Sequence, residues 1–462
     1  MKTARWLLSS CLLGSTLSAL PEASSTHVHA QEPAPSRTMT VTPEQVRAEA
    51  NVEAEAKELG LDEALATAKQ HAPELRQAAA ATRAAQARIG SARAPLLPQV
   101  TGTASYARGT FNGPQVFQGQ ADQSWSTRNT FSAGLRASQL LWDFGQAWNL
   151  KEAAKDNAAA QLQTQHATEL DISFGVRSAF LTAGANRALV DVARATLSNQ
   201  ERHRAQIQGF VEVGTRPPID LAQARTDVAT AKLALIRAEN DYAAAKAQLS
   251  RSMGTPSRAD FEVSAELPPP EESETASIDV LVQLAERERP ELAALNAQLA
   301  AQHATVDSIK GQYGPTLNLV GSVDEGGYKI NQLATNLSAG VTLNWPIFQG
   351  GLTNSRVDEG HAVITQLDAQ RETLRQDLRV AVTQAELAIN AAQAALEAAD
   401  ELVKLAQERV TLAEGRYQTG VGNTIELGDA ELAQRDAQTQ RVTAQYDLAS
   451  ARAQLHRTLG RP

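Results

Sequence analysis

The sequence predicts a mixed fold of α-helices and transmembrane β-strands, in which a long α-helical coiled-coil barrel is joined to a β-barrel. Three observations predict it. The chain contains an internal two-fold repeat, each copy holds two short segments of alternating apolar and polar residues, and each copy holds one very long alanine-rich segment. A period of two residues indicates strands, and a heptad pattern along a long segment indicates coiled coils.

Length and composition limit the possible folds and functions. At 462 residues the chain is too long for one ordinary compact core, so two or more structural units are expected. Aromatic residues make up only 4% of the chain while alanine is abundant, which favours long helices that pack closely on small side chains. The net charge of −9 argues against a nucleic-acid partner, because nucleic acid requires a basic surface.

Residues 1–30 are predicted to be a secretory signal peptide. Lys2 and Arg5 supply its positive charge, and the short segment Trp6–Leu20 is apolar. Cys11, the only cysteine, follows Leu8-Ser9-Ser10 as in a lipoprotein processing site, and whether it is lipidated stays open. If Cys11 is removed with the signal, the mature chain cannot form a disulfide. Two segments fit the pattern of a cleavage site, Val28-His29-Ala30 and Pro21-Glu22-Ala23.

The internal repeat defines the organisation of the chain. Ala72-Pro73-Glu74-Leu75 matches Arg289-Pro290-Glu291-Leu292, and from Gly145 onward the matching residues lie 206 positions apart. We divide the chain into an N-terminal linker at 31–58, a first repeat at 59–254, a proline- and acid-rich linker at 255–283 and a second repeat at 284–462. The first copy carries eleven extra residues between Tyr106 and Phe131, which predicts a free loop there.

Two alternating segments in each repeat predict four membrane strands per chain. About 9–11 tilted residues with one apolar face suffice to cross a bilayer. A half-buried sheet of a soluble protein has the same pattern, but the signal peptide and the aromatic residues near the strand ends favour the membrane. No segment reaches the ~20 apolar residues of a membrane helix. The apolar positions are Val100, Gly102, Ala104 and Tyr106; Phe131, Ala133, Leu135 and Ala137; Leu317, Leu319, Gly321 and Val323; and Leu337, Ala339, Val341, Leu343 and Trp345.

Four strands cannot close a barrel in lipid. Known membrane barrels have at least eight strands, and an open sheet edge would leave backbone groups without hydrogen-bond partners in the bilayer. Two copies would give eight strands, whose side chains fill the interior. Three copies would give a 12-strand β-barrel with an open lumen, so a chain that forms a passage is expected to be a homotrimer that contacts membrane lipid.

The remaining segments of each repeat predict helices. Ala147–Val213 and Leu352–Thr419 predict two helices of about 67 residues, each about 100 Å long. The shorter helical segments of each repeat, about 22 and 35 residues, can lie end to end beside one long helix. Alanine recurs every seven residues in the last helix of each repeat, which favours close coiled-coil packing over mere helix propensity. These alanines are Ala224, Ala231, Ala238 and Ala245, and Ala430, Ala437, Ala444 and Ala451.

Four motifs occur in a fixed order, and the first repeat contains versions of them. They are Ala72-Pro73-Glu74-Leu75, Pro98-Gln99, Trp345-Pro346-Ile347-Phe348-Gln349-Gly350-Gly351 and Arg416-Tyr417-Gln418-Thr419-Gly420. With these motifs the chain resembles TolC-like outer-membrane efflux proteins from about Leu59 to Gly460. The first copy departs from the family pattern where Ser138–Gly145 lacks the proline and where Pro217-Pro218 follow the turn.

The resemblance implies a trimer with a twelve-strand barrel in the outer membrane of a Gram-negative bacterium and a helical tunnel through the periplasm. It also implies partners: outer-membrane lipid, a periplasmic adaptor protein and an inner-membrane pump. The implied function is the outer-membrane channel of a tripartite efflux or type I secretion system.

A periplasmic coiled-coil scaffold without a pore is the alternative function. It explains the helices but leaves the duplicated strand pairs without a role. In the sequence, no group of histidine, cysteine or carboxylate residues has metal-ligand spacing, and no glycine-rich phosphate loop occurs. We therefore expect no metal, no cofactor and no enzymatic activity.

The turns that follow the two long helices are the candidate adaptor-docking tips. They lie at the helix ends farthest from the strands, where only a periplasmic partner can reach. Glycine permits the positive φ that such a turn needs, and Asn423 or Thr424 can cap the helix that follows. The candidate docking residues are Gly214, Thr215, Gly420, Val421, Gly422 and Asn423.

Glu212 and Glu414 are a possible acidic gate. Both lie in the last turns of the long helices, where acids are disfavoured by the helix dipole. Threefold symmetry would gather such residues into a negative ring that attracts cations. The resemblance implies an acidic gate in this region, although Thr411 stands where a second acid is expected. A solvated outer face is the alternative interpretation.

Overall fold

The computed structural model describes residues 57–117, 120–255, 260–265, 267 and 276–461. The predicted signal peptide, Cys11, most of the N-terminal linker and Pro268-Pro269-Pro270 lie outside these ranges. The two halves of the described chain hold the same kinds of elements in the same order. The first half contains α2 (Leu61–His71), α3 (Pro73–Arg93), β2 (Gln99–Phe117), β3 (Gln120–Trp142), α4 (Gln146–Glu212) and α5 (Pro218–Ser252). The second half contains α6 (Ile278–Glu288), α7 (Pro290–Lys310), β5 (Thr316–Gly327), β6 (Ala334–Asn344), α8 (Leu352–Gln418) and α9 (Thr424–Leu459).

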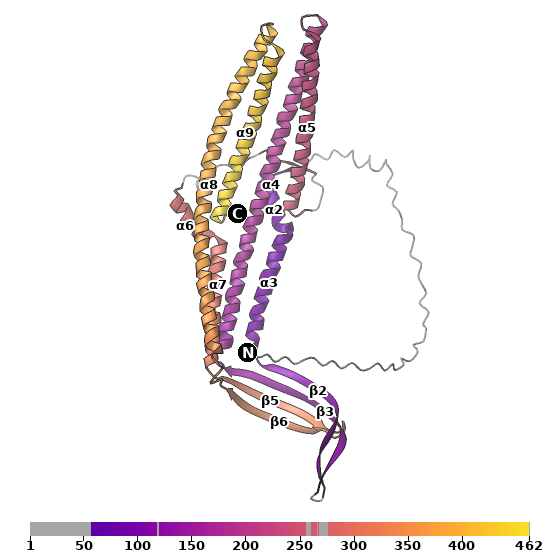
Figure 1. The fold of residues 1–462 in the computed structure, drawn as a ribbon, viewed down its shortest axis with the longest axis vertical. Coiled ribbons are helices and arrows are strands. Elements are labelled where there is room, and N and C mark those ends of the chain that lie inside the picture. The colour runs from indigo at the N-terminus through magenta and orange to yellow at the C-terminus, as the bar shows by residue number, and fades with distance from the viewer. Residues whose placement is uncertain (1–56, 118–119, 256–259, 266, 268–275, 462) are drawn as a thin grey trace, which may run out of the picture. The chain divides into compact units, whose positions relative to one another are not determined.

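The two long helices α4 and α8 have 67 residues each, as predicted. Both α3 and α5 pack on α4, while α7 and α9 pack on α8, and α4 also contacts α7 and α9 (Figure 1). Gly254, just after α5, has a φ of +72°, and a Cβ there would lie 2.8 Å from the Cα of Ala72, just before α3. A Cβ on Gly460, just after α9, would likewise lie 3.0 Å from the carbonyl oxygen of Glu288, at the end of α6. The shorter helices therefore stack end to end beside the long ones.

The predicted alanine seam is the packing surface of α5 and α9. Six of its eight alanines are buried, and the remaining Ala238 and Ala451 are half-buried. Small side chains at heptad spacing let the helix backbones approach closely, which explains why alanine dominates the composition of these helices. Among the described residues, no helix is both long and apolar enough to cross a bilayer.

The four long strands form one antiparallel sheet in the order β2-β3-β5-β6. On one face, hydroxyl groups pair across the strands: Ser105 with Ser132 at 2.8 Å, and Ser322 with Ser338 at 2.9 Å. On the other face, the register places Gly102, Leu135, Val323 and Leu337 in one row across the sheet. The Leu135 and Leu337 side chains are 59% and 80% exposed in the single chain. The alternation predicted for the strands is therefore present, with one polar and one apolar face.

The predicted free loop between Tyr106 and Phe131 is instead a continuation of the sheet. These two residues pair, their rings lie 5.0 Å apart, and the β2–β3 pairing continues as far as Phe117 and Gln120. Because the insertion lengthens both strands together, the backbone groups of its described residues pair with each other as far as Phe117 and Gln120.

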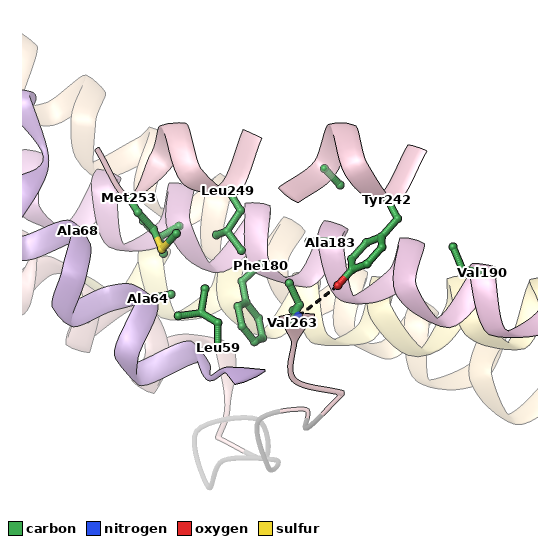
Figure 2. Close-up of a cluster of buried hydrophobic side chains, with 12 residues drawn as sticks. Leu59, Ala64, Ala68, Phe180, Ala183, Val190, Tyr242, Leu249, Met253 and Val263 are labelled. Atoms are coloured by element: carbon green, nitrogen blue, oxygen red, sulfur yellow. Dashed lines mark hydrogen bonds between the residues drawn. The ribbon is translucent and has the colours of Figure 1, made fainter. Parts of the chain in front are cut away.

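The predicted linker at 255–283 also contains regular structure. Phe261–Val263 forms β4, which pairs in parallel with β1 (Lys57–Leu59), and α6 begins at Ile278. Val263 is fully buried in an apolar cluster with Leu59 and with Phe180 of α4 (Figure 2). This short strand forms because the Val263 side chain fills a core position. Periodicity over only three residues cannot reveal such a strand in the sequence.

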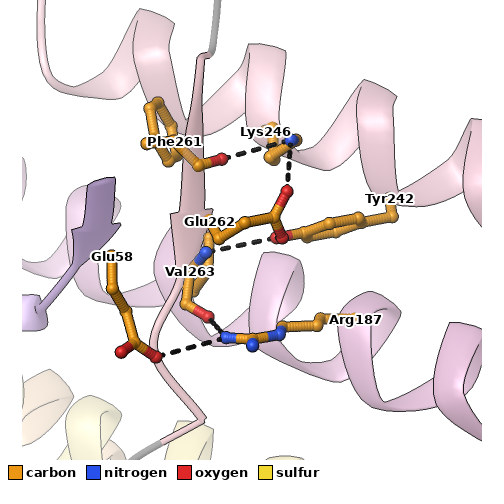
Figure 3. A network of polar contacts seen from close by, with 7 residues as sticks. All are labelled: Glu58, Arg187, Tyr242, Lys246, Phe261, Glu262 and Val263. Atoms are coloured by element: carbon orange, nitrogen blue, oxygen red, sulfur yellow. Dashed lines mark hydrogen bonds and ion pairs between the residues drawn. The ribbon is translucent and has the colours of Figure 1, made fainter. Parts of the chain in front are cut away.

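Polar contacts also bind β4 to the first long helix pair (Figure 3). The Tyr242 hydroxyl donates to a Glu262 carboxylate oxygen at 2.7 Å, and the Lys246 ammonium donates to the other oxygen at 3.2 Å. Arg187 of α4 donates to the Val263 carbonyl oxygen and contacts Glu58 of β1 at 3.5 Å. Three of these four contacts hold β4, a segment between the repeats, on the first repeat.

This network predicts a pH dependence of stability. Burial alone would raise the pKa of Glu262, but the hydrogen bonds from Tyr242 and Lys246 outweigh it, so that pKa is lowered. Because this pKa is lower in the folded than in the unfolded chain, ionised Glu262 stabilises the fold at pH values above the ordinary carboxyl pKa. This stabilisation is lost as the pH falls below about 4.5. Burial and the Glu262 contact raise the pKa of Tyr242 to about 12, so its contribution is lost as the pH rises from 10 towards 12.

We expect Glu262→Gln to lose stability at neutral pH and to show a smaller further loss on acidification than the native protein. Thermal unfolding of the detergent-solubilised protein, followed by circular dichroism between pH 3.5 and 7, measures this. Glu397→Gln, an exposed carboxylate on α8, serves as the control. Equal acid sensitivity of Glu262→Gln and the native protein would show that the network contributes nothing.

Candidate functional site

The first helix turn joins α4 to α5 through residues 213–217. Gly214 has a φ of +76°, and the Thr215 amide donates to the Phe210 carbonyl oxygen at 3.0 Å. The Thr215 hydroxyl donates to the same oxygen at 2.9 Å. This is the pattern of a glycine-terminated helix, in which the backbone reverses and satisfies the last carbonyl groups. The two prolines are compatible with it, because Pro218 occupies the first position of α5, where no amide donor is needed.

The second turn, between α8 and α9, has the same geometry. Gly420 has a φ of +78°, and the Val421 amide donates to the Arg416 carbonyl oxygen at 3.1 Å. Gly422 lies tightly against the helix, since a Cβ there would be 3.1 Å from the Cβ of Arg416. The Asn423 side chain accepts a hydrogen bond from the Glu426 amide at 2.7 Å, so Asn423 is the cap of α9.

Both turns expose branched apolar side chains. Val213 and Ile219 flank the first turn with 73% and 70% of their surface exposed. Val421 and Ile425 at the second turn are 75% and 73% exposed. Each turn follows a 67-residue helix that starts beside the sheet, so these side chains lie about 100 Å along the helices from the strands. Large exposed apolar groups at such a place indicate a contact surface.

Arg216 links the first turn to the end of α8. Its guanidinium donates to the Tyr417 carbonyl oxygen at 3.0 Å and lies 4.4 Å above the Tyr417 ring. A cation at this position also complements the partial negative charge at the C-terminus of α8. Tyr417 is 1% exposed and packs in a cluster that includes Ile207 of α4 and Leu427 of α9. The two helix pairs are therefore joined near their tips by an apolar cluster and by one arginine.

The structure separates the two candidate gate acids. Glu414 is exposed and lines a cavity of about 610 Å³ between α4, α8 and α9. Glu212, the last residue of α4, is also exposed and accepts a hydrogen bond from Gln208 at 3.0 Å, but it does not line that cavity. The other charged side chains that line the cavity are Arg202, Arg435 and Glu431, and His203 lies beside them.

Comparison with models of protein families identifies the family of this chain. A family model described as outer membrane efflux protein matches residues 64–255 and 281–461, which is most of the chain. The chain belongs to this family. The efflux protein is therefore an outer-membrane channel component, as the resemblance implied, and a scaffold without a pore is set aside.

Individual relatives agree with the family. The efflux protein is 26% identical over 404 residues to the toluene efflux pump outer membrane protein TtgF of Pseudomonas putida, covering 86% of this chain and 82% of the relative. It is 27% identical over 337 residues to the pyoverdine export outer membrane protein OpmQ of Pseudomonas aeruginosa, covering 71% and 68%.

Solved structures share the fold. The outer membrane protein VceC from Vibrio cholerae superposes with a TM-score of 0.75 at 19% identity, covering 87% of this chain and 96% of that chain. A membrane protein from Pseudomonas aeruginosa gives a TM-score of 0.76 at 22% identity, covering 88% and 91%. The efflux protein thus has the mixed fold of long helices and a strand domain that the sequence predicts.

Sequence patterns identify the turn residues of the efflux protein but do not point to a role for Arg216, Tyr417 or His203. Tyr417 was noted only as part of a family motif, and its ring lies 5.5 Å from the ring of His203. The available signal was at Arg216, which stands where the second repeat has Gly422. A long cation replacing a turn glycine in one copy indicates a contact that the other copy does not make.

Proposed function

We propose that the efflux protein is a homotrimeric passive duct without catalytic activity, which receives its cargo from a periplasmic adaptor and an inner-membrane pump. The observation that carries this proposal is the four-stranded sheet with β2 and β6 at its edges. Its apolar face is exposed in the single chain and its two edges have no partner among the described strands. Lipid cannot satisfy the backbone groups of those edges, so further copies must pair with them. Three copies give twelve strands and an open lumen.

We propose that the two turns are the adaptor-docking tips. The shared turn geometry at Gly214 and Gly420 supports this proposal, because each chain then presents two similar protruding turns to a partner. The exposed apolar side chains around them supply contact area for a periplasmic helix or loop. The residues proposed for contact remain Gly214, Thr215, Gly420, Val421, Gly422 and Asn423.

We propose that Glu414 contributes more than Glu212 to an acidic gate near these tips. Its position on the cavity between α4, α8 and α9 supports this role, because a charge there lies between the two helix pairs. The contact of Arg216 with Tyr417 joins the same two pairs near this cavity.

The trimer is tested by native mass spectrometry in detergent together with planar-bilayer recording. We expect a mass corresponding to three chains and stepwise conductance of a water-filled pore. A stable monomer or dimer that conducts ions would refute the twelve-strand barrel. A trimer that never conducts would refute the duct.

A further inference from the structure

A line of exposed aromatic side chains leads from the apolar face of the sheet onto the start of α4. Trp142, the last residue of β3, pairs with Leu317 of that apolar face. Its ring makes an edge contact with Phe144 at 5.9 Å, and Trp148 follows in the first turn of α4. The three aromatic residues are 59%, 51% and 56% exposed in the single chain. Exposed aromatic groups at the ends of membrane strands are typical of the level of the lipid headgroups.

Two lysines and one glutamate continue this line. The Lys151 ammonium lies 4.1 Å from the centre of the Trp148 ring and donates to one Glu152 carboxylate oxygen at 3.1 Å. The Lys155 ammonium donates to the other oxygen at 3.3 Å. The hydrogen bonds from Lys151 and Lys155 lower the pKa of Glu152, so this carboxylate stays ionised at neutral pH. We call Lys151, Glu152 and Lys155 the lysine–glutamate row.

The side chains of the lysine–glutamate row lean towards the membrane. In a helix the Cα–Cβ bonds tilt towards the N-terminus, and the N-terminus of α4 adjoins the sheet (Figure 1). The contacts agree, because Lys151 reaches back to Trp148, and Lys155 reaches back to Glu152. Lys151 lies five residues beyond Gln146, the first residue of α4, which is about 8 Å along the helix. Long cationic side chains at this level extend into the headgroup layer.

Only the first repeat carries this row. At the positions 206 residues later, the second repeat has no tryptophan and no lysine. Those positions are Asn354, Val357, Asp358 and His361. The junction between strand and long helix forms in both repeats, so the fold does not require the row.

We propose that Trp148 and the lysine–glutamate row bind the headgroup of phosphatidylethanolamine in the periplasmic leaflet of the outer membrane, one molecule per chain. This zwitterionic headgroup carries a phosphate and a primary ammonium. The inference rests on the proposed barrel, because the apolar face of the sheet contacts lipid only when that barrel spans the membrane. It adds a ligand and its site to the proposed duct.

The charges of the row match this headgroup. The phosphate accepts charge-assisted hydrogen bonds from Lys151 and Lys155, whose ammonium groups have three donors each and use one on Glu152. The lipid ammonium donates to Glu152, because a carboxylate has about four acceptor positions and the lysines use two. The Trp148 ring lies against the glycerol region, as indole rings do at membrane interfaces. A headgroup with a phosphate but no ammonium would leave Glu152 facing a negative charge.

Competition between two lipids tests the site in the full-length protein. The purified trimer in detergent is mixed with equal amounts of palmitoyl-oleoyl phosphatidylethanolamine and palmitoyl-oleoyl phosphatidylglycerol, and bound lipids are counted by native mass spectrometry. We expect the native protein to retain phosphatidylethanolamine in preference to phosphatidylglycerol. Lys151→Gln combined with Lys155→Gln should weaken retention of both lipids by about tenfold, because the phosphate loses its charged donors. Glu152→Gln should remove the preference, because only phosphatidylethanolamine uses that carboxylate.

Lys310→Gln is the matched control. Lys310 ends α7 beside the strands and also pairs with an acid three residues earlier, Asp307, at 3.0 Å, so it repeats the charge pair outside the row. It should keep both the retention and the preference. Unchanged retention in the double lysine variant, or an unchanged preference in Glu152→Gln, would overturn the site. A trimer that retains neither lipid would overturn the site and leave the duct standing, whereas absence of any trimer would refute the proposed function itself.

Discussion

Gly420→Leu is expected to reduce export and adaptor crosslinking strongly while the protein still assembles in the outer membrane. The backbone of Gly420 has a φ of +78°, a conformation that costs an ordinary L-residue about 1–2 kcal/mol. No other atom lies within 4 Å of a Cβ placed there, so the effect comes from the backbone of the turn and not from a clash. If the chain relieves a strain of this size by reshaping the turn, docking would weaken by about 5- to 30-fold.

Gly420→Asn is the matched control. Asparagine is close to leucine in size but tolerates the left-handed conformation, so the turn keeps its shape and export should be largely retained. Both variants are measured by export in cells that carry the pump and adaptor, by site-specific crosslinking to the adaptor, and by native mass spectrometry. Normal crosslinking of Gly420→Leu would indicate that the glycine serves only the turn and not docking.

Elements with a long repeating pattern could be predicted from the sequence. The 67-residue helices and the alanine seam are set by periodicity over many turns, so tertiary contacts add to a preference that the sequence already carries. The turn at Gly420 could also be predicted, but from residue types. A glycine at a helix end specifies a left-handed residue, and Asn423 specifies the cap of the next helix.

Features that depend on contacts between distant segments could not be predicted. The strand β4 has three residues, and it forms because Val263 fills a core position beside Phe180. The contact of Arg216 with Tyr417 joins residues 201 positions apart in the two repeats. The β2–β3 extension was expected to be a loop, because the first copy carries eleven residues there that the second copy lacks. In each case the structure follows from a partner that local pattern does not specify.

Glu414→Ala is expected to reduce the cation preference of the open pore and to weaken block by multivalent cations. The cavity that Glu414 lines carries two arginines and two glutamates, so removal of one acid changes the charge of its described lining from zero to +1 per chain. In a homotrimer this removes three negative charges around one axis, where charges of one sign set ion selectivity. Single-channel recording in planar bilayers under a salt gradient measures the shift in reversal potential.

Glu212→Ala is the internal comparison for this prediction. Glu212 is equally a carboxylate near the end of a long helix, but it is exposed beside Gln208 and does not line the cavity. Its removal should therefore shift the reversal potential much less than that of Glu414. Unchanged traces in Glu414→Ala would show that this acid belongs to a solvated outer face. Equal shifts in the two variants would mean that the general charge of the periplasmic mouth, and not the cavity, controls selectivity.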